Sequence, residues 1–352
     1  MHMLKHFFKT LYEEKFDAFI ASFLKFISLG VDLLISSKVE PLKIVPILIS
    51  FVYLLYHLMQ SYELSRNTYL SVSMPYFVCL GQKHSWFENA ARQQEETLLR
   101  EGVPWSGIQR SFRIYKPDWA FSQERRLSSD NNAQDWMRTY EKIEEHFNRL
   151  INRVEKPLTL HFFIVVPESF AFALGAKLGY RATLKLYQYS GVSRKPYFIV
   201  FDTSRLSGAE GYSISKAITQ RSKFRSIRVN EIGQDLSKSD IIITLKDTGH
   251  RLQREGVALI RKTMDCSILE VDIAINYQAS SLPSEWLSVA SEVFSLIADQ
   301  AEAGKRVHLF LAVPSSLSFL IGLLIRSNSD IFLYQYDRNS EAYFRAFSLS
   351  EL

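Results

Sequence analysis

The stretch HFFIVVPESFAFALG (His161–Gly175) is almost repeated as HLFLAVPSSLSFLIG (His308–Gly322). The repeat continues without a gap to the tetrapeptide LYQY, which ends at Tyr189 in the first copy and at Tyr336 in the second. Eleven of the 29 aligned positions are identical at a constant offset of 147 residues, whereas average composition would give roughly two identities by chance. This period is too long for a solenoid, so the chain contains two copies of a domain-sized unit.

The surrounding sequence alternates between strand-like and helix-like stretches from Tyr69 onward, which indicates α/β units around a largely parallel sheet. In the first copy, residues 67–203, we expect strands at 69–80, 111–116, 158–166, 182–189 and 196–202, and helices at 86–102 and 135–155. In the second copy, residues 240–352, we expect strands at 240–245, 268–275, 306–313, 330–337 and 342–349, and helices at 251–263 and 283–304. A polar loop follows 111–116 in the first copy. Residues 204–239, rich in Ser and Arg, are the expected linker, which could also supply a helix at 212–222.

Composition narrows the class of protein only slightly. The 352 residues are 47% hydrophobic and carry a net charge of +5, which mildly favours an anionic partner. The two cysteines, Cys79 and Cys266, offer neither a disulfide framework nor metal-ligand spacing, which suits a reducing compartment. We therefore expect no metal and no cofactor.

The first 66 residues are much more apolar than the rest and read as a membrane region with two hydrophobic helices, at about 16–36 and 44–64. Ile44–Met59 holds sixteen residues without a formal charge, and extension to residue 64 reaches the roughly twenty residues that cross a bilayer. Lysines before the first segment favour a cytoplasmic N-terminus. We expect a membrane hairpin with the rest of the chain in the cytoplasm.

Three charged residues in the first segment, Asp17, Lys25 and Asp32, form a polar stripe. At 100° per residue, Lys25 and Asp32 lie about 80° and 60° from Asp17, on one helical face. Such a helix either lies in the headgroup region or spans the bilayer with its stripe towards partner helices or water. The sequence leaves both alternatives open.

The doubled strand–Pro–helix step, followed each time by LYQY and an aromatic strand, resembles the SAVED domain. SAVED domains are the cyclic-oligonucleotide sensors of CBASS anti-phage systems and resemble two fused CARF-like, Rossmann-like units. The resemblance covers residues 67–352 and is better in the second copy. It implies a SAVED-like pseudo-dimer fused to an effector, for which the N-terminal membrane hairpin is the candidate in this sequence.

Ligands of open α/β sheets gather at the carboxyl ends of the strands. Each copy offers two such loops, and Pro167 and Pro314 open helices whose N-termini suit phosphate. Basic side chains there can balance phosphodiester charge, hydroxyls can donate hydrogen bonds, and aromatic or imidazole rings can stack on bases. The expected ligand-binding residues are Gln82, Lys83, His84, Trp86, Pro167, Glu168, Ser169, Lys246, Asp247, Thr248, His250, Arg251, Pro314, Ser315 and Ser316. Glu168 opposes phosphate and is expected to select a base edge or to contact the other copy.

Metalloprotease, Walker, paired CxxC and GxSxG motifs are absent from the sequence, so we expect no catalytic residues. The leading hypothesis is an effector anchored in the bacterial inner membrane. It would bind a cyclic di-, tri- or tetranucleotide, self-associate, and disrupt the membrane in abortive infection. Its partners would then be this ligand, the lipid bilayer and other copies of the chain, with no DNA or RNA duplex. The alternatives are a membrane-tethered, ring-nuclease-like enzyme using His84, His250 or Asp247 as general base, and a membrane scaffold.

Overall fold

The computed structural model describes most of the chain beyond residue 71. The described ranges are 72–103, 105–127, 133–154, 157–178, 182–189, 197–203, 224–232, 239–264, 266–273, 282–325 and 330–352. The two expected hydrophobic helices, with Asp17, Lys25 and Asp32, lie outside these ranges. Within the ranges, no helix combines the length and apolar character that crossing a membrane would need.

The first copy folds around a five-stranded mixed sheet in the order β2-β1-β3-β4-β5. Its strands are β1 (Val72–Leu80), β2 (Ala120–Gln123), β3 (Leu158–Val165), β4 (Thr183–Tyr189) and β5 (Tyr197–Asp202). The first four run parallel, and β5 pairs antiparallel with β4. β1 and β3 are apolar along nearly their whole length because helices cover both faces of the sheet.

The second copy forms a six-stranded mixed sheet in the order β11-β10-β9-β7-β8-β6. Its strands are β6 (Ile227–Ile232), β7 (Asp240–Lys246), β8 (Ser267–Ile273), β9 (Arg306–Ala312), β10 (Ile331–Asp337) and β11 (Ala342–Ser348). β7, β8, β9 and β10 are parallel, while β6 and β11 lie antiparallel on the two edges. The prediction of an α/β fold is confirmed, and the structure shows that both sheets are mixed.

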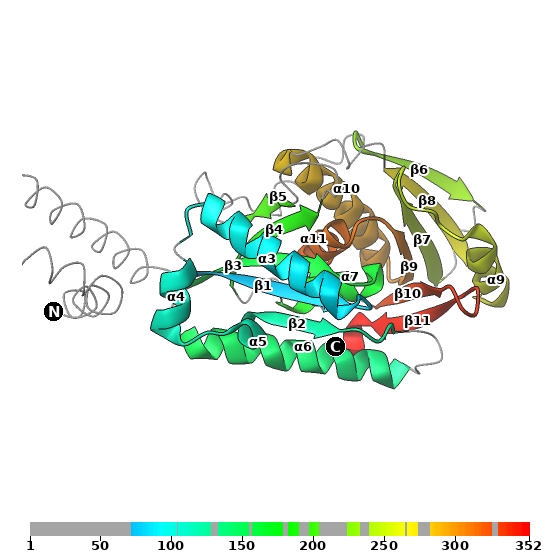
Figure 1. The fold of residues 1–352 in the computed structure, drawn as a ribbon. Helices are drawn as coiled ribbons and strands as arrows, with labels where there is room; N and C mark the ends of the chain where they lie inside the picture. Colours follow the sequence, from blue (N-terminus) through cyan, green and yellow to red (C-terminus); the bar gives the residue numbers. More distant parts are fainter. Residues whose placement is uncertain are drawn as a thin grey trace, which may run out of the picture.

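The helices differ in length between the copies. In the first copy they are α3 (His84–Arg100), α4 (Trp105–Phe112), α5 (Lys116–Trp119), α6 (Ala133–Val154) and α7 (Glu168–Leu178). In the second copy they are α9 (Arg254–Met264), α10 (Pro283–Glu302), α11 (Ser315–Ile325) and the short 3₁₀ helix η2 (Leu349–Glu351). Figure 1 shows α7 and α11 at the centre of the molecule, with α3 and α6 on opposite faces of the first sheet.

The two copies join through α7 and α11, which pack directly against each other. Each of these helices also contacts the sheet of the other copy: α7 meets β9, β10 and β11, and α11 meets β3 and β4. Every described side chain of both helices except the ends is buried, which explains why their sequences are apolar all round. One continuous hydrophobic core therefore runs through both copies.

The repeated sequence folds twice into the same local structure. His161 Nδ1 lies 2.8 Å from the Tyr187 hydroxyl, and His308 Nδ1 lies 3.1 Å from the Tyr334 hydroxyl. His308 and Tyr334 each lie 147 residues after His161 and Tyr187, respectively. The register of β4 against β5 shifts at Tyr187, and that of β10 against β11 shifts at Tyr334. The two copies thus share the histidine–tyrosine hydrogen bond and the register shift, as well as the sequence.

Two details of the expected organisation are wrong. Residues 111–116 do not form a strand: α4 continues to Phe112, Arg113 adopts a left-handed φ of 51°, and Pro117 lies in the first turn of α5. The alternating Phe112 and Ile114 imitate a strand, but Trp105 and Ile108 belong to the same buried helical face. The strand instead follows at β2, inside the stretch expected to be a polar loop. Similarly, β6 lies within residues 204–239, which were expected to form a linker with at most a helix, because its backbone completes the edge of the second sheet.

Candidate functional site

A cleft of about 290 Å³ opens where the carboxyl ends of β1 and β3 meet the turn between β10 and β11. We call it the inter-copy cleft, because the strand ends belong to the first copy and the turn to the second. Its lining residues are Leu80, Gly81, Gln82, Arg126, Leu127, Val165, Val166, Pro167, Gln335, Tyr336, Asp337, Arg338 and Asn339. The cleft lies at the sheet edge where ligands of parallel α/β sheets gather.

Gln335 is held in this cleft by the N-terminus of α7. Ser169 Oγ donates a hydrogen bond of 2.9 Å to Gln335 Oε1, and the Ser169 backbone N–H approaches the same oxygen at 3.4 Å. Gln335 Nε2 in turn donates to Glu168 Oε2 at 3.3 Å. The amide side chain of one copy is therefore fixed by the helix start of the other.

The opposite helix start repeats this arrangement. Ser316 Oγ donates to Gln188 Oε1, and Ser316 and Gln188 are the 147-residue counterparts of Ser169 and Gln335. Ser315 Oγ also donates to the Val166 carbonyl oxygen at 2.7 Å. The serines expected at the two helix starts thus lie at the junction of the copies, where three of their hydroxyls join one copy to the other.

Glu168 makes the two helix starts electrically different, since its counterpart in the second copy is Ser315. Burial raises the pKa of the Glu168 carboxyl above its ordinary value, although hydrogen bonds from its own backbone and Gln335 oppose the shift. The positive charges of His250 and Arg338 also act on this carboxyl, in the same opposing direction. An acid that is protonated more readily than a free glutamate therefore lies beside the cleft, in contact with its lining residue Gln335.

The KDTGHR loop after β7 approaches this acid from the second copy. Asp247 Oδ1 organises the loop by accepting bonds from the backbone N–H groups of Gly249 and His250, at 2.9 and 2.7 Å. The His250 ring lies 2.9 Å from the same oxygen, and this hydrogen bond raises the pKa of His250, with Glu168 adding to the effect. Asp247 is therefore the residue that shapes the loop, and His250 is the one whose charge reaches Glu168.

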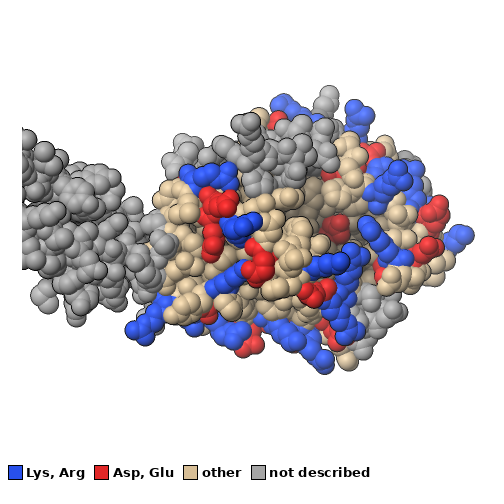
Figure 2. All heavy atoms as spheres, viewed as in Figure 1, with Lys and Arg blue, Asp and Glu red and all other residues tan. Residues whose placement is uncertain are grey.

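Two arginines in the cleft, Arg126 and Arg338, were not among the expected residues. Gly81 makes room for the first: its φ is +73°, and a Cβ there would lie 3.0 Å from Arg126 Cγ. Arg338 lies in the β10–β11 turn, which Asp337 stabilises by accepting bonds from Asn339 N and Ser340 Oγ, both at 3.1 Å. Figure 2 shows Lys and Arg side chains gathered over the carboxyl ends of β1 and β2, beside this turn.

Other expected residues lie outside the inter-copy cleft. Lys83 and His84 are exposed at the start of α3, where the His84 backbone N–H donates to Glu124 Oε1 at 2.6 Å. The Trp86 ring packs edge-on against Tyr189, with ring centroids 6.5 Å apart. Lys246 pairs with Asp272 at 3.0 Å, so its charge is already partly balanced.

The structure therefore brings together part of the expected set. Gln82 and Pro167 line the cleft, and Glu168, Ser169, Ser315, Asp247 and His250 act on it through the contacts above. Ser316 and Pro314 lie at the second helix start, while Thr248 and Arg251 are exposed in the loop after β7. Gln335 could have been found from the sequence, because the glutamine is the polar residue that both LYQY motifs share. Arg126 and Arg338 lie outside the repeat, and only the fold brings them to one cleft.

Comparison with known proteins identifies part of the chain. Residues 192–349 match the family model of the SMODS-associated and fused to various effectors sensor domain. The short name of this family is SAVED, and the match covers less than half of the chain. The matched segment contains β5 to β11 and so includes the whole second sheet. No curated protein matches the chain.

Two solved structures share the SAVED/CARF fold with this chain. Both are of the Cap4 SAVED/CARF-domain containing receptor of Acinetobacter baumannii, one with the cyclic trinucleotide 3'3'3'-cAAA and one with 2'3'3'-cAAA. Each match has a TM-score of 0.51 and 12% sequence identity, and covers 85% of this chain and 56% of the receptor. The chain thus spans little more than half the length of those receptors, and the likeness is one of fold.

Proposed function

We propose that this protein is a sensor that binds a cyclic oligonucleotide in the inter-copy cleft. The observation that carries the proposal is the composition of that cleft, in which strand ends of one copy and a hairpin turn of the other provide a single surface. A ligand bound there touches both copies at once. The SAVED match and the fold shared with two receptors of cyclic trinucleotides support the same assignment.

The cleft offers the chemistry that such a ligand needs. Arg126 and Arg338 supply positive charge for phosphodiesters, and the guanidinium fork matches phosphate oxygens. The start of α7, which follows the cleft residue Pro167, adds the partial positive charge of a helix dipole. Gln335 and Tyr336 supply an amide and an aromatic ring, which can contact base edges and faces.

Glu168 contributes selectivity in this proposal. An ionised carboxylate would repel phosphate, but burial favours the neutral acid at this position. A neutral carboxyl can donate one hydrogen bond and accept others, so it can contact a base edge without a charge penalty. We therefore assign phosphate binding to the arginines and base selection to Glu168 and Gln335.

The output of the sensor belongs to the same proposal. Residues 1–66 would form a hairpin in the bacterial inner membrane, with the described region in the cytoplasm. Ligand binding would favour self-association of the described region, gather the N-terminal helices and disrupt the membrane, as expected of an effector in abortive infection. A ligand can drive this change only by binding the associated state more tightly than the free state.

One observation favours an enzyme as the second candidate. Asp247 and His250 form a hydrogen-bonded carboxylate–imidazole pair beside the cleft, and such a pair can orient and activate a general base. We propose a sensor without catalytic activity nonetheless, because Asp247 Oδ1 is already committed to two backbone N–H groups of its own loop. In this role the pair shapes the loop.

Incubation of the full chain with cyclic triadenylate, followed by recovery and analysis of the nucleotide, tests the proposal. The sensor predicts saturable binding and recovery of the intact ring. Recovery of linear or shorter products would assign the enzyme instead, and absence of binding to any cyclic di-, tri- or tetranucleotide would leave the scaffold. The variant His250→Gln separates the first two outcomes, because it would abolish cleavage by an enzyme but would leave a sensor able to bind.

A further inference from the structure

A second pocket, of about 240 Å³, lies at the opposite edge of the second sheet, where its parallel strands begin. We call it the amino-end pocket. Its lining residues are Asp240, Met264, Arg306, His308, Phe332, Tyr334 and Arg345. Asp240 and Arg306 are the first residues of β7 and β9, so this pocket is separated from the inter-copy cleft by the length of these strands.

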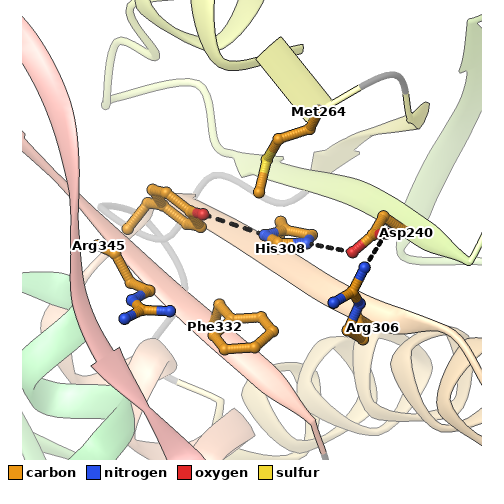
Figure 3. A pocket seen from close by; sticks show the side chains of 7 residues that line it. Asp240, Met264, Arg306, His308, Phe332 and Arg345 are labelled. Atoms are coloured by element: carbon orange, nitrogen blue, oxygen red, sulfur yellow. Dashed lines mark hydrogen bonds and ion pairs between the residues drawn. The ribbon is translucent and has the colours of Figure 1, made fainter.

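A chain of hydrogen bonds forms the floor of the amino-end pocket (Figure 3). His308 Nε2 lies 2.9 Å from Asp240 Oδ1, and His308 Nδ1 lies 3.1 Å from the Tyr334 hydroxyl. Arg306 donates to Asp240 Oδ2 at 2.6 Å. Asp240 is thus shared between a buried imidazole and an arginine, and each of its oxygens already accepts a hydrogen bond.

The corresponding positions of the first copy show which residues of this pocket the two copies share. By the pairing register and the 147-residue offset, the positions of Asp240, Arg306, Phe332 and Arg345 are held there by Ser73, Thr159, Lys185 and Ile199. The histidine and tyrosine are kept, but His161 Nε2 is buried without a hydrogen-bond partner among the described residues. The shared packing therefore needs only the histidine and tyrosine, and the acid and two arginines are additions of the second copy.

The helix beside this position differs in length between the two copies. α3 and α9 each follow the first parallel strand of their copy, but α3 has 17 residues and α9 has 11. The difference of six residues corresponds to about 9 Å of helix. In the first copy burial raises the pKa of Tyr187, and Glu101, just beyond α3, is near enough to add to this shift. In the second copy α9 ends at Met264, at the rim of the pocket.

The charge of the amino-end pocket is suited to an anion. Arg306 is already paired with Asp240, whereas the side chain of Arg345 makes no hydrogen bond or ion pair with the residues that the structure describes. The Arg345 guanidinium lies 5.5 Å from the centre of the Phe332 ring, which leaves its N–H donors at the mouth of the pocket. Among the residues that line the pocket, two arginines against one aspartate leave one positive charge beside the apolar surfaces of Phe332, Tyr334 and Met264. The Asp330 carboxylate, outside this lining, acts on Arg306 but is not among the charges that act on Arg345 in the described part of the chain.

We propose that the amino-end pocket binds a small aromatic anion, with its carboxylate or phosphate on Arg345 and Arg306 and its ring among Phe332, Tyr334 and Met264. The size is adequate, since an apolar cavity of about 150 Å³ admits benzene. A planar guanidinium binds either anionic group with two parallel hydrogen bonds. This site is distinct from the inter-copy cleft and does not depend on what the cleft binds.

Titration calorimetry of the full chain with benzoate, phenyl phosphate and benzyl alcohol, without any cyclic nucleotide, tests the proposal. One of the two anions should bind with a stoichiometry of one per chain, and the preferred anion identifies the group that the arginines recognise. Benzyl alcohol, which has the ring but no charge, should bind at least tenfold more weakly. Equal binding of the alcohol, or no saturable binding of either anion, would overturn the proposal.

Variants then locate the binding. Arg345→Gln should weaken the preferred anion at least tenfold, because its side chain is exposed and its loss leaves the fold intact. Lys185→Gln, which removes one positive charge near the corresponding position of the first copy, should leave affinity unchanged. Thermal denaturation of both variants verifies folding, and unchanged affinity in a folded Arg345→Gln protein would remove the site.

Discussion

Gly175 of α7 and Phe319 of α11 lie so close that a Cβ built on the glycine would be 2.0 Å from the Phe319 carbonyl oxygen. Gly322 of α11 faces Phe172 of α7 in the same way, at 2.1 Å. Both residues of the second contact are displaced by 147 positions from those of the first. Such reciprocal contacts define an isologous interface, so the two copies meet as the halves of a symmetric dimer do.

Gly175→Ala should therefore destabilise the protein. The added methyl group meets backbone and cannot be accommodated by a side-chain rotation, so α7 and α11 must separate. We expect a loss of about 1–3 kcal/mol in the free energy of unfolding, the usual range for overpacking, despite the better helix propensity of alanine. Urea denaturation measures it, with Lys177→Ala in the same helix as the control. A variant as stable as the wild-type protein would contradict the close packing.

The cross-copy hydrogen bond between Ser169 and Gln335 should appear as an energetic coupling. A double-mutant cycle with Ser169→Ala and Gln335→Leu should give a coupling free energy of about 0.5–1.5 kcal/mol, the net contribution of such a hydrogen bond to stability. The matched control is the cycle of Ser169→Ala with Gln188→Leu, because Gln188 bonds to the other serine, Ser316. Equal coupling in both cycles would mean that the effect is not this bond.

Glu168 predicts a pH dependence of stability. Its pKa is raised on folding, so the folded state retains a proton that the unfolded state has lost. Stability from this group is consequently unaffected below the ordinary pKa of about 4.5 and falls as the pH rises from there through the folded-state pKa. Glu168→Gln should remove that fall. Unfolding free energies of both proteins between about pH 4 and pH 8 test this, and parallel profiles would contradict it.

The arginines of the inter-copy cleft should matter more for ligand binding than Lys246. Arg126→Gln and Arg338→Gln should each weaken cyclic triadenylate at least tenfold and reduce the salt dependence of binding, because each removes a phosphate contact. Lys246→Gln should have a smaller effect, since Asp272 already balances this charge. Fluorescence titration at two salt concentrations gives both quantities. A larger loss in Lys246→Gln would return the site to the loop after β7.

The repeated part of the fold could be predicted from the sequence, and the parts outside the repeat were predicted less well. The offset of 147 residues predicted two equivalent strand–helix steps, and the His161 and His308 pairs with tyrosine show the same geometry. The false strand at 111–116 arose because a short alternation resembles a strand, while pairing with β1 selected residues 120–123 instead. Tertiary contacts override such local patterns.

The candidate site was harder to predict than the fold for a physical reason. Arg126 and Arg338 are 212 residues apart and share no motif, so their meeting depends on how one copy docks on the other. His84 and His250 were expected at the site because ligands gather at the carboxyl ends of parallel strands. Of these two, only His250 lies near Glu168 beside the cleft. A motif can show where a strand ends, but which side chains meet at that end depends on how the two copies pack together.

The stoichiometry of ligand binding tests whether the two copies form one shared binding site. If a single cyclic oligonucleotide occupies a cleft built from both copies, titration calorimetry of the full chain with cyclic triadenylate should give one ligand per chain, and the Ser169→Ala/Gln335→Leu double variant should weaken it. Two ligands per chain would mean that each copy binds separately. That result, or no binding of any cyclic oligonucleotide, would contradict the account.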